Sequence, residues 1–238
     1  MKKALLTLLA LSTAALANAK TLIVYYSYTN NVHQIATDLQ DQTGADILRV
    51  EPAEEGVQYD ANGYAIGSAL IAAIRSNPND ASSYPAIKET NVDLSAYDTF
   101  LIGTPLWWSN MAAPMQTFLF QHGAEMAGKN IGLIVSSASS GISDVVADAK
   151  RLIPNGKFLE PNLWIRSSQT SNRHSLVASW LTNINYSTIA ALPAVEADGE
   201  QGGTVRYDLA GRRLTSQPAK GLYVERRSDG TARKVVRR

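Results

Sequence analysis

The sequence predicts an α/β fold, a doubly wound parallel sheet with helices on both faces, followed by a small antiparallel β segment. Continuous apolar runs of strand length alternate with segments of helical periodicity between residues 20 and 193. Apolar runs without polar alternation are typical of strands covered on both faces, and strand–helix alternation favours parallel pairing. Residues 204–238 instead alternate apolar and polar positions, which is typical of short antiparallel strands.

The first half of the main body contains two predicted strands and two predicted helices. The strands are the apolar run at 22–27 and the segment at 45–50. A helix between them is indicated by apolar residues with i, i+3, i+4, i+7 spacing, namely Val32, Ile35, Ala36 and Leu39. Residues 51–95 are less regular. We expect one helix there, which ends at Asn77-Pro78 and carries Ile66, Leu70, Ile71 and Ile74.

The second half repeats the alternation. Strands are predicted at 97–105, at 130–137 and within 157–165. The first of these is followed by a helix carrying Met115, Phe118 and Leu119, and the second by a helix carrying Val145, Ala149 and Leu152. The segment 175–192 is predicted to be the closing helix.

The N-terminal segment is predicted to be a Sec-type signal peptide. Lys2 and Lys3 precede an apolar run, and Ala17-Asn18-Ala19 supplies the small residues that a signal peptidase reads. We therefore expect cleavage after Ala19 and a periplasmic, secreted or cell-surface location. A membrane anchor is the alternative, but the run is short for a span of about 20 residues. No transmembrane segment is expected after cleavage.

Charge divides the rest of the chain. Residues 20–193 hold 10 basic and 15 acidic residues, a net charge of −5, whereas residues 194–238 hold 10 and 6, a net charge of +4. The Gly-containing acidic stretch at 194–203 is predicted to be a linker between the main domain and a β-hairpin module at 204–238. The basic residues of this module alternate with strand positions as a solvated face would, and export is expected, so we expect no nucleic-acid partner.

Composition excludes several chemistries. The chain has no cysteine, which rules out disulfides, thiol redox chemistry and Cys-based zinc sites. Its three histidines, His33, His122 and His174, are far apart in sequence, and we expect no metal site. Redox work by this chain would therefore require a cofactor.

Ligands of open parallel sheets bind beyond the carboxyl ends of the strands, so the loops after the first, third and fourth predicted strands are the candidate site. The first loop leads into a helix, whose unpaired N–H groups and dipole suit a phosphate; simple helix capping is the alternative. It consists of Ser27, Tyr28, Thr29, Asn30, Asn31 and Val32.

The other two loops suit a flat aromatic ligand. In the loop 103–110, the adjacent Trp107 and Trp108 cannot both point into one core, so at least one is expected at the surface or in a pocket. The loop 136–143 is small and rich in hydrogen-bonding groups, which suits a close backbone approach to a ligand edge. The alternatives are that the Trp residues pack against helices or the tail, and that the Ser-rich stretch is a plain polar loop.

Taken together, the three loops resemble those of the flavodoxin-like proteins. In the most similar subfamily the third-strand loop reads Gly-x-Pro-x-Trp-Trp with Pro and Phe-Leu beyond it, and the fourth-strand loop reads Thr-Ser-Gly-Gly-Ser-Gly. The resemblance covers residues 21 to about 190. It is carried most strongly by Gly103, Pro105, Trp107, Trp108, Pro114, Phe118 and Leu119.

The resemblance implies a five-stranded parallel sheet of order 2-1-3-4-5 and flavin mononucleotide (FMN) as cofactor. Residues 27–32 would hold the phosphate. Pro105, Leu106, Trp107 and Trp108 would flank the isoalloxazine, and Ser137, Ala138, Ser139, Ser140 and Gly141 would meet its pyrimidine edge. The implied function is electron transfer, as a carrier or a small quinone reductase-like oxidoreductase, with a redox partner protein or a quinone-like molecule. By analogy a homodimer is one alternative for its assembly.

Four positions depart from the pattern. Asn30 and Val32 stand where the family has Gly and Thr, and Ala138 and Ser139 stand where it has two glycines. Asn tolerates the left-handed conformation, whereas Val32 lacks a hydroxyl donor. The second hypothesis is therefore a binding or interaction module of the same fold that has lost flavin.

The tail has a resemblance of its own. The segments YDLAGRR, KGLYV and KVV are similar to the C-terminal sorting modules of proteins exported by type IX secretion. This similarity implies delivery to the cell surface, and periplasmic retention is the alternative. In the less regular segment 51–95, Tyr59, Tyr64 and Arg75 can reach a substrate, although surface packing is the simpler expectation for each.

Overall fold

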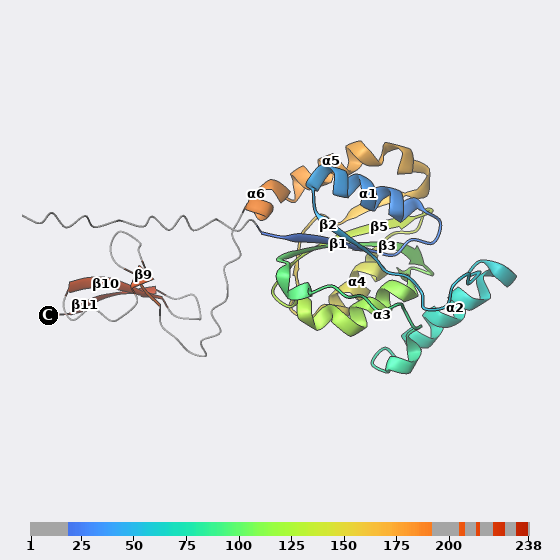
Figure 1. Ribbon diagram of the computed structural model, residues 1–238, viewed down its shortest axis with the longest axis horizontal. Coiled ribbons are helices and arrows are strands. Elements are labelled where there is room, and N and C mark those ends of the chain that lie inside the picture. The colour runs from blue at the N-terminus through green and yellow to red at the C-terminus, as the bar shows by residue number, and fades with distance from the viewer. Residues whose placement is uncertain (1–18, 192–204, 208–212, 215–220, 227–231, 238) are drawn as a thin grey trace, which may run out of the picture. The chain divides into compact units, whose positions relative to one another are not determined.

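The computed structural model describes residues 19–191 and four shorter segments, 205–207, 213–214, 221–226 and 232–237 (Figure 1). The chain forms two compact units, divided between Ala194 and Val195. The expected signal peptide and the expected linker at 194–203 lie outside the described residues, except for Ala19.

The first unit is built on a parallel sheet. Its strands follow the order β2-β1-β3-β5-β6, with β7 also paired to β5, and all of these pairs are parallel. The order 2-1-3-4-5 is thereby confirmed. The bounds are Thr21–Tyr25 (β1), Asp46–Arg49 (β2), Thr99–Trp107 (β3), Asn130–Ser137 (β5), Lys157–Phe158 (β6) and Leu163–Arg166 (β7).

The predicted fifth strand is in two pieces. β6 pairs with the start of β5 and β7 pairs with its end, and the segment between them contains Pro161. Proline has no N–H to donate to a sheet ladder, which is consistent with the interruption. A short strand that the sequence does not predict, β4 (Asn110–Met111), pairs antiparallel with the end of β3.

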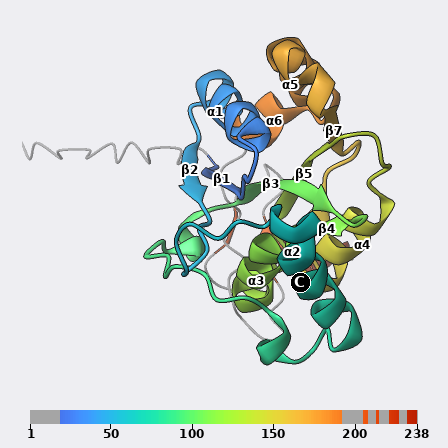
Figure 2. The ribbon, with the colours of Figure 1, turned by 90° about the vertical axis from the view of Figure 1, so that its right-hand side faces the viewer.

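Helices cover both faces of the sheet. Figures 1 and 2 show α1 (Asn31–Thr43) and α5 (Arg173–Asn183) on one side, and α3 (Ala113–His122) and α4 (Ser143–Leu152) on the other. The continuous apolar run of β1 explains the arrangement, because successive side chains point to opposite faces. Ile23 belongs to the core under α1 and α5, whereas Leu22 and Val24 belong to the core under α3 and α4.

The segment between β2 and β3 contains α2 (Ala61–Ser76) and the short 3-10 turns Ala81–Ser83 and Leu94–Ala96. α2 ends before Asn77-Pro78, as predicted. Ile71 and Ile74 are buried, whereas Ile66 is exposed. Two further 3-10 segments are Gly123–Met126, after α3, and Ser167–Asn172, before α5.

The prediction of one continuous closing helix at 175–192 is wrong, because the helix is interrupted. The structure has α5 and a separate α6 (Tyr186–Ala191). Asn185, between them, has a left-handed backbone with φ of 54°, which a helix cannot continue through.

The second unit is a four-stranded antiparallel sheet of order β11-β10-β8-β9, which confirms the predicted antiparallel segment. Its strands are Val205–Tyr207 (β8), Arg213–Leu214 (β9), Gly221–Arg226 (β10) and Ala232–Arg237 (β11). Arg206 donates to Glu225 at 3.0 Å. The segments that connect these strands, 208–212, 215–220 and 227–231, lie outside the described residues. Among the residues that the structure describes, no helix has the length and apolar character needed to cross a membrane.

Candidate functional site

A cleft of about 490 Å³ lies at the carboxyl ends of β1, β3 and β5. The three loops that the sequence singles out meet there, because parallel strands end at the same edge of a sheet. The predicted site residues that line the cleft are Tyr28, Thr29, Asn31, Pro105, Leu106, Trp107, Trp108, Ser137 and Ala138. The remaining lining residues are Tyr59, Tyr64, Gly67, Ser136 and Ser167, and all fourteen side chains are uncharged.

The loop after β1 contains hydrogen-bonding groups without partners. The Ser27 hydroxyl is buried and has no hydrogen-bond partner, although burying such a group usually requires one. No side chain caps α1, and within the described residues no acceptor is present for the backbone N–H groups of Asn31, Val32 and His33. These donors, at the positive end of a helix dipole, fit an anion such as a phosphate.

Asn30 and Val32 explain how the loop forms without the family's Gly and Thr. Asn30 adopts a left-handed conformation with φ of 67°, which Asn tolerates better than most residues. Val32 is 1% exposed and belongs to the core under α1. Its side chain lies over Gly103, where an added Cβ would be 3.1 Å from Val32 Cγ1 and 3.0 Å from Tyr25 Cβ. Only the backbone of Val32 is thus placed to contact a phosphate. Ser27, Asn30 and Val32 do not line the cleft; Ser27 lines a neighbouring hollow, which shares Tyr28 and Tyr59 with the cleft.

The two tryptophans have different surroundings, as their adjacency predicts. Trp107 is half-buried and packs against Tyr59 and edge-on against Tyr26, with ring centroids 4.9 and 5.7 Å apart. Trp108 is 40% exposed and contacts Tyr64 at 6.2 Å between centroids. The prediction that at least one of them lies at the surface or in a pocket is confirmed, since both line the cleft.

The segment 51–76 supplies a further wall of the cleft. Of the three residues for which reaching a substrate was the alternative to surface packing, Tyr59 and Tyr64 line the cleft and Arg75 does not. Tyr59 is buried against Trp107, Tyr64 is 54% exposed, and Gly67 lies so close to Trp108 that an added Cβ would be 3.0 Å from its ring. The hydroxyl of Tyr28 donates to Asp60, which ties the loop after β1 to the start of α2. The tyrosines of this segment are the only sign of this wall in the sequence. Because they are far in sequence from the other three loops, the sequence does not show that all four segments meet at one cleft.

The Ser-rich loop contributes only its first part. Ser137 donates to the Ser140 carbonyl at 2.9 Å and accepts a hydrogen bond from the Trp164 indole at 2.8 Å. Ser136, Ser137 and Ala138 line the cleft, whereas Ser139, Ser140 and Gly141 are exposed and do not. An added Cβ at Gly141 would meet no atom within 4 Å, so this glycine is not required for close packing.

The phenols around the cleft are held in their neutral form. Burial, with the nearby Tyr59 and Tyr28, raises the pKa of Tyr26 strongly. Burial, with the charge of Glu54 and the nearby Tyr28, raises the pKa of Tyr59. The hydrogen bond to Asp60 raises the pKa of Tyr28. These rings act as aromatic surfaces and hydrogen-bonding groups at neutral pH. Within the described part of the chain, no group of His, Asp and Glu side chains could hold a metal ion.

The cleft and the loop after β1 together therefore have the parts that FMN requires: unpaired donors in the loop for the phosphate, and in the cleft aromatic side chains for the ring system and a small polar loop for the ring edge. The orphaned Ser27 hydroxyl is the observation that fits an absent anionic group most directly.

Comparison with known proteins agrees with the fold. Residues 20–184 match the family model described as flavodoxin. A candidate flavoprotein from Bacteroides eggerthii is 24% identical, with a TM-score of 0.56 over 71% of this chain and 99% of that one. A flavoprotein from Lactobacillus acidophilus, solved in complex with FMN, is 24% identical, with a TM-score of 0.52 over 66% and 99% of the two chains. No curated protein matches the sequence. The chain belongs to the flavodoxin family.

Proposed function

We propose that this protein binds FMN in the cleft and transfers electrons, as a carrier or as a small FMN-dependent oxidoreductase. The observation that carries the proposal is one uncharged cleft in which Tyr28, Thr29 and Asn31 of the loop after β1 meet Trp107 and Trp108 after β3. The same loop holds the unpaired Ser27 hydroxyl and the unpaired N–H groups of α1. When bound, FMN supplies the redox chemistry, and the protein supplies binding, orientation and the electrostatic environment.

Different groups of the chain would contact different parts of FMN. The N–H groups at the start of α1 and the Ser27 hydroxyl would hold the phosphate. Trp107, packed against Tyr59, would form a rigid aromatic wall beside the ring system. Ser136 to Ala138 would pass along its polar edge. The lining contains no carboxylate, imidazole or ammonium group, so no described side chain in the cleft is suited to act as a general acid or base at neutral pH.

The mouth of the cleft suggests the kind of electron acceptor or donor. Tyr64 and Trp108 are large, exposed aromatic side chains beside the cleft. Exposed aromatic surface next to a binding site favours a flat apolar substrate or a protein partner. We propose a quinone-like molecule or a redox partner protein in this role.

A flavin titration tests the proposal. The purified chain should quench the fluorescence of FMN with about micromolar or tighter affinity. Riboflavin, which lacks the phosphate, should bind at least about tenfold more weakly, because the α1 donors would stay unpaired. Absence of quenching by the chain at high concentration would contradict flavin binding and favour a flavin-free interaction module.

Export is proposed separately, from the N-terminal sequence pattern. N-terminal sequencing of the protein from the native cell envelope should begin at Lys20. Finding the uncleaved N-terminus in the cytoplasm would contradict export. Removal of residues 204–238 should leave flavin binding unchanged but lower surface display if the tail is a sorting module.

A further inference from the structure

The turn that carries Trp108 has an unfavourable backbone. β3 and β4 form a hairpin in which Trp107 faces Asn110, so that Trp108 and Ser109 alone connect the strands. Both connecting residues are left-handed, with φ of 46° and 67°. Such two-residue turns normally use Asn-Gly, because the left-handed conformation is unfavourable for most other residues. A conformation of this kind persists where its surroundings hold it in place.

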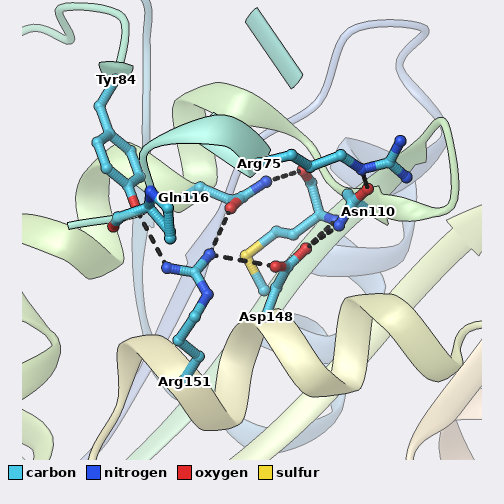
Figure 3. A network of polar contacts seen from close by, with 8 residues as sticks. Arg75, Tyr84, Asn110, Gln116, Asp148 and Arg151 are labelled. Atoms are coloured by element: carbon cyan, nitrogen blue, oxygen red, sulfur yellow. Dashed lines mark hydrogen bonds and ion pairs between the residues drawn. The ribbon is translucent and has the colours of Figure 1, made fainter. Parts of the chain in front are cut away.

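Arg75, in the last turn of α2, bridges this turn from one side, and Figure 3 shows its hydrogen bond to Asn110. Its Nη2 donates to the Trp108 carbonyl at 2.7 Å, and its Nε donates to Asn110 Oδ1 at 2.6 Å. One planar guanidinium thus bonds the left-handed residue and the first residue of β4. The geometry uses the fork of an arginine, which a lysine cannot reproduce.

The other side of the turn is fixed by α4. Asp148 Oδ2 accepts hydrogen bonds from Asn110 Nδ2 at 2.9 Å and from the Met111 backbone at 3.1 Å. Its Oδ1 accepts from Arg151 at 3.1 Å, and Arg151 also donates to Gln116 and Tyr84. Asn110, Gln116 and Asp148 are buried. The β4 end of the turn is therefore anchored in the core, while the Trp108 end is held by Arg75.

α2 and the turn meet a second time at the cleft. Trp108 packs over Gly67, and its ring contacts that of Tyr64. Arg75 thus joins two walls of the cleft that come from separate parts of the sequence. It does so without lining the cleft itself.

We propose that Arg75 is a positioning residue that fixes the Trp108 turn, and through it the aromatic wall, in the geometry that accepts the flavin ring. The inference rests on the proposed function for its effect on flavin affinity. Its structural part, the immobilisation of Trp108, is independent of any ligand.

The test compares Arg75→Met and Arg75→Lys in the full chain labelled with 5-fluorotryptophan, with the Trp108 fluorine resonance assigned by Trp108→Phe. In the flavin-free protein, Arg75→Met should broaden or split the Trp108 resonance, whereas those of Trp164 and Trp180 stay unchanged. FMN and riboflavin affinities should fall by the same factor, about tenfold, because the ring site and not the phosphate site is disturbed. Arg75→Lys should give a smaller loss, since it keeps one of the two hydrogen bonds.

Lys150→Met is the matched control, because it removes an exposed cation from α4 that takes no part in the Arg75 network. It should leave the fluorine spectrum and both affinities unchanged. An unchanged Trp108 resonance together with flavin affinities within about twofold of wild type in Arg75→Met would overturn the proposal. If the wild-type chain binds no flavin, the proposed function fails, and the fluorine spectrum alone still decides whether Arg75 holds the turn.

Discussion

The loop after β1 and the turn after β3 lie on the same cleft but are built in opposite ways. The loop leaves a buried hydroxyl and the first N–H groups of α1 without partners. The turn has an unfavourable backbone, yet hydrogen bonds from α2 and to α4 hold it on both sides. The difference agrees with the proposal that a ligand completes the loop, whereas the protein's own hydrogen bonds hold the turn.

The largest expected effect separates the two tryptophans of the wall. Trp107→Ala should lower the free energy of unfolding by about 3 kcal/mol, because Trp107 packs against the core and Tyr59. Trp108→Ala should cost about 1 kcal/mol or less, since that side chain is 40% exposed. Both should abolish tight FMN binding. Urea unfolding and flavin titration measure the two quantities, and equal stability losses would contradict the assignment of Trp107 as core.

Gly103 lies where the two regions touch. Gly103→Ala would place a Cβ 3.0 Å from Tyr25 Cβ and 3.1 Å from Val32 Cγ1, which should cost about 1–3 kcal/mol of stability through overpacking. Gly141→Ala, in the exposed part of the Ser-rich loop, has open space and serves as the control. Thermal or urea unfolding should separate them clearly. A neutral Gly103→Ala would show that α1 can shift away from the sheet.

Tyr26 connects the loop after β1 with the turn after β3, since it directly follows β1 and packs edge-on against Trp107. Burial raises its pKa above the ordinary value of about 10. Above pH about 10 the folded chain therefore keeps a proton that the unfolded chain loses, whereas below that pH this proton makes no pH-dependent contribution to stability. Above it, stability should fall by about 1.4 kcal/mol per pH unit for this proton. Urea unfolding across this range should show a shallower decline in Tyr26→Phe, and an unchanged slope would argue against burial of the phenol. Tyr64→Phe, which removes an exposed hydroxyl, is the control.

The smallest expected effect on stability comes from a substitution in the loop after β1. Ser27→Ala removes a buried hydroxyl that has no partner, so the flavin-free protein should become more stable by about 1 kcal/mol. The same change should weaken FMN about tenfold and leave riboflavin unaffected, because the hydroxyl is assigned to the phosphate. Ser139→Ala, which removes an exposed hydroxyl from the Ser-rich loop, should change neither. Loss of stability in Ser27→Ala would mean that the hydroxyl has a partner within the protein.

Much of the fold could be predicted because the local periodicity of apolar residues indicates which residues are buried. The apolar runs of β1, β3 and β5 and the stripe Val32, Ile35, Ala36 and Leu39 identify the strands and α1 without knowledge of the fold. The break between α5 and α6 could not be predicted in this way, since the apolar spacing runs through it and the left-handed Asn185 is a property of the backbone.

The candidate site was predictable only in part, for a related reason. The amino-acid pattern predicts that three loops gather at one edge of a parallel sheet and that Trp107 and Trp108 cannot share one core. The folded chain, in contrast, is needed to see that Val32 packs over Gly103 and that Tyr59, Tyr64 and Gly67 close the cleft. The same is true of Arg75 and Asp148, which hold the Trp108 turn from two helices. Periodicity specifies which face of an element is buried, but the side chains that meet across a cleft depend on the path of the chain between elements, which local pattern does not encode.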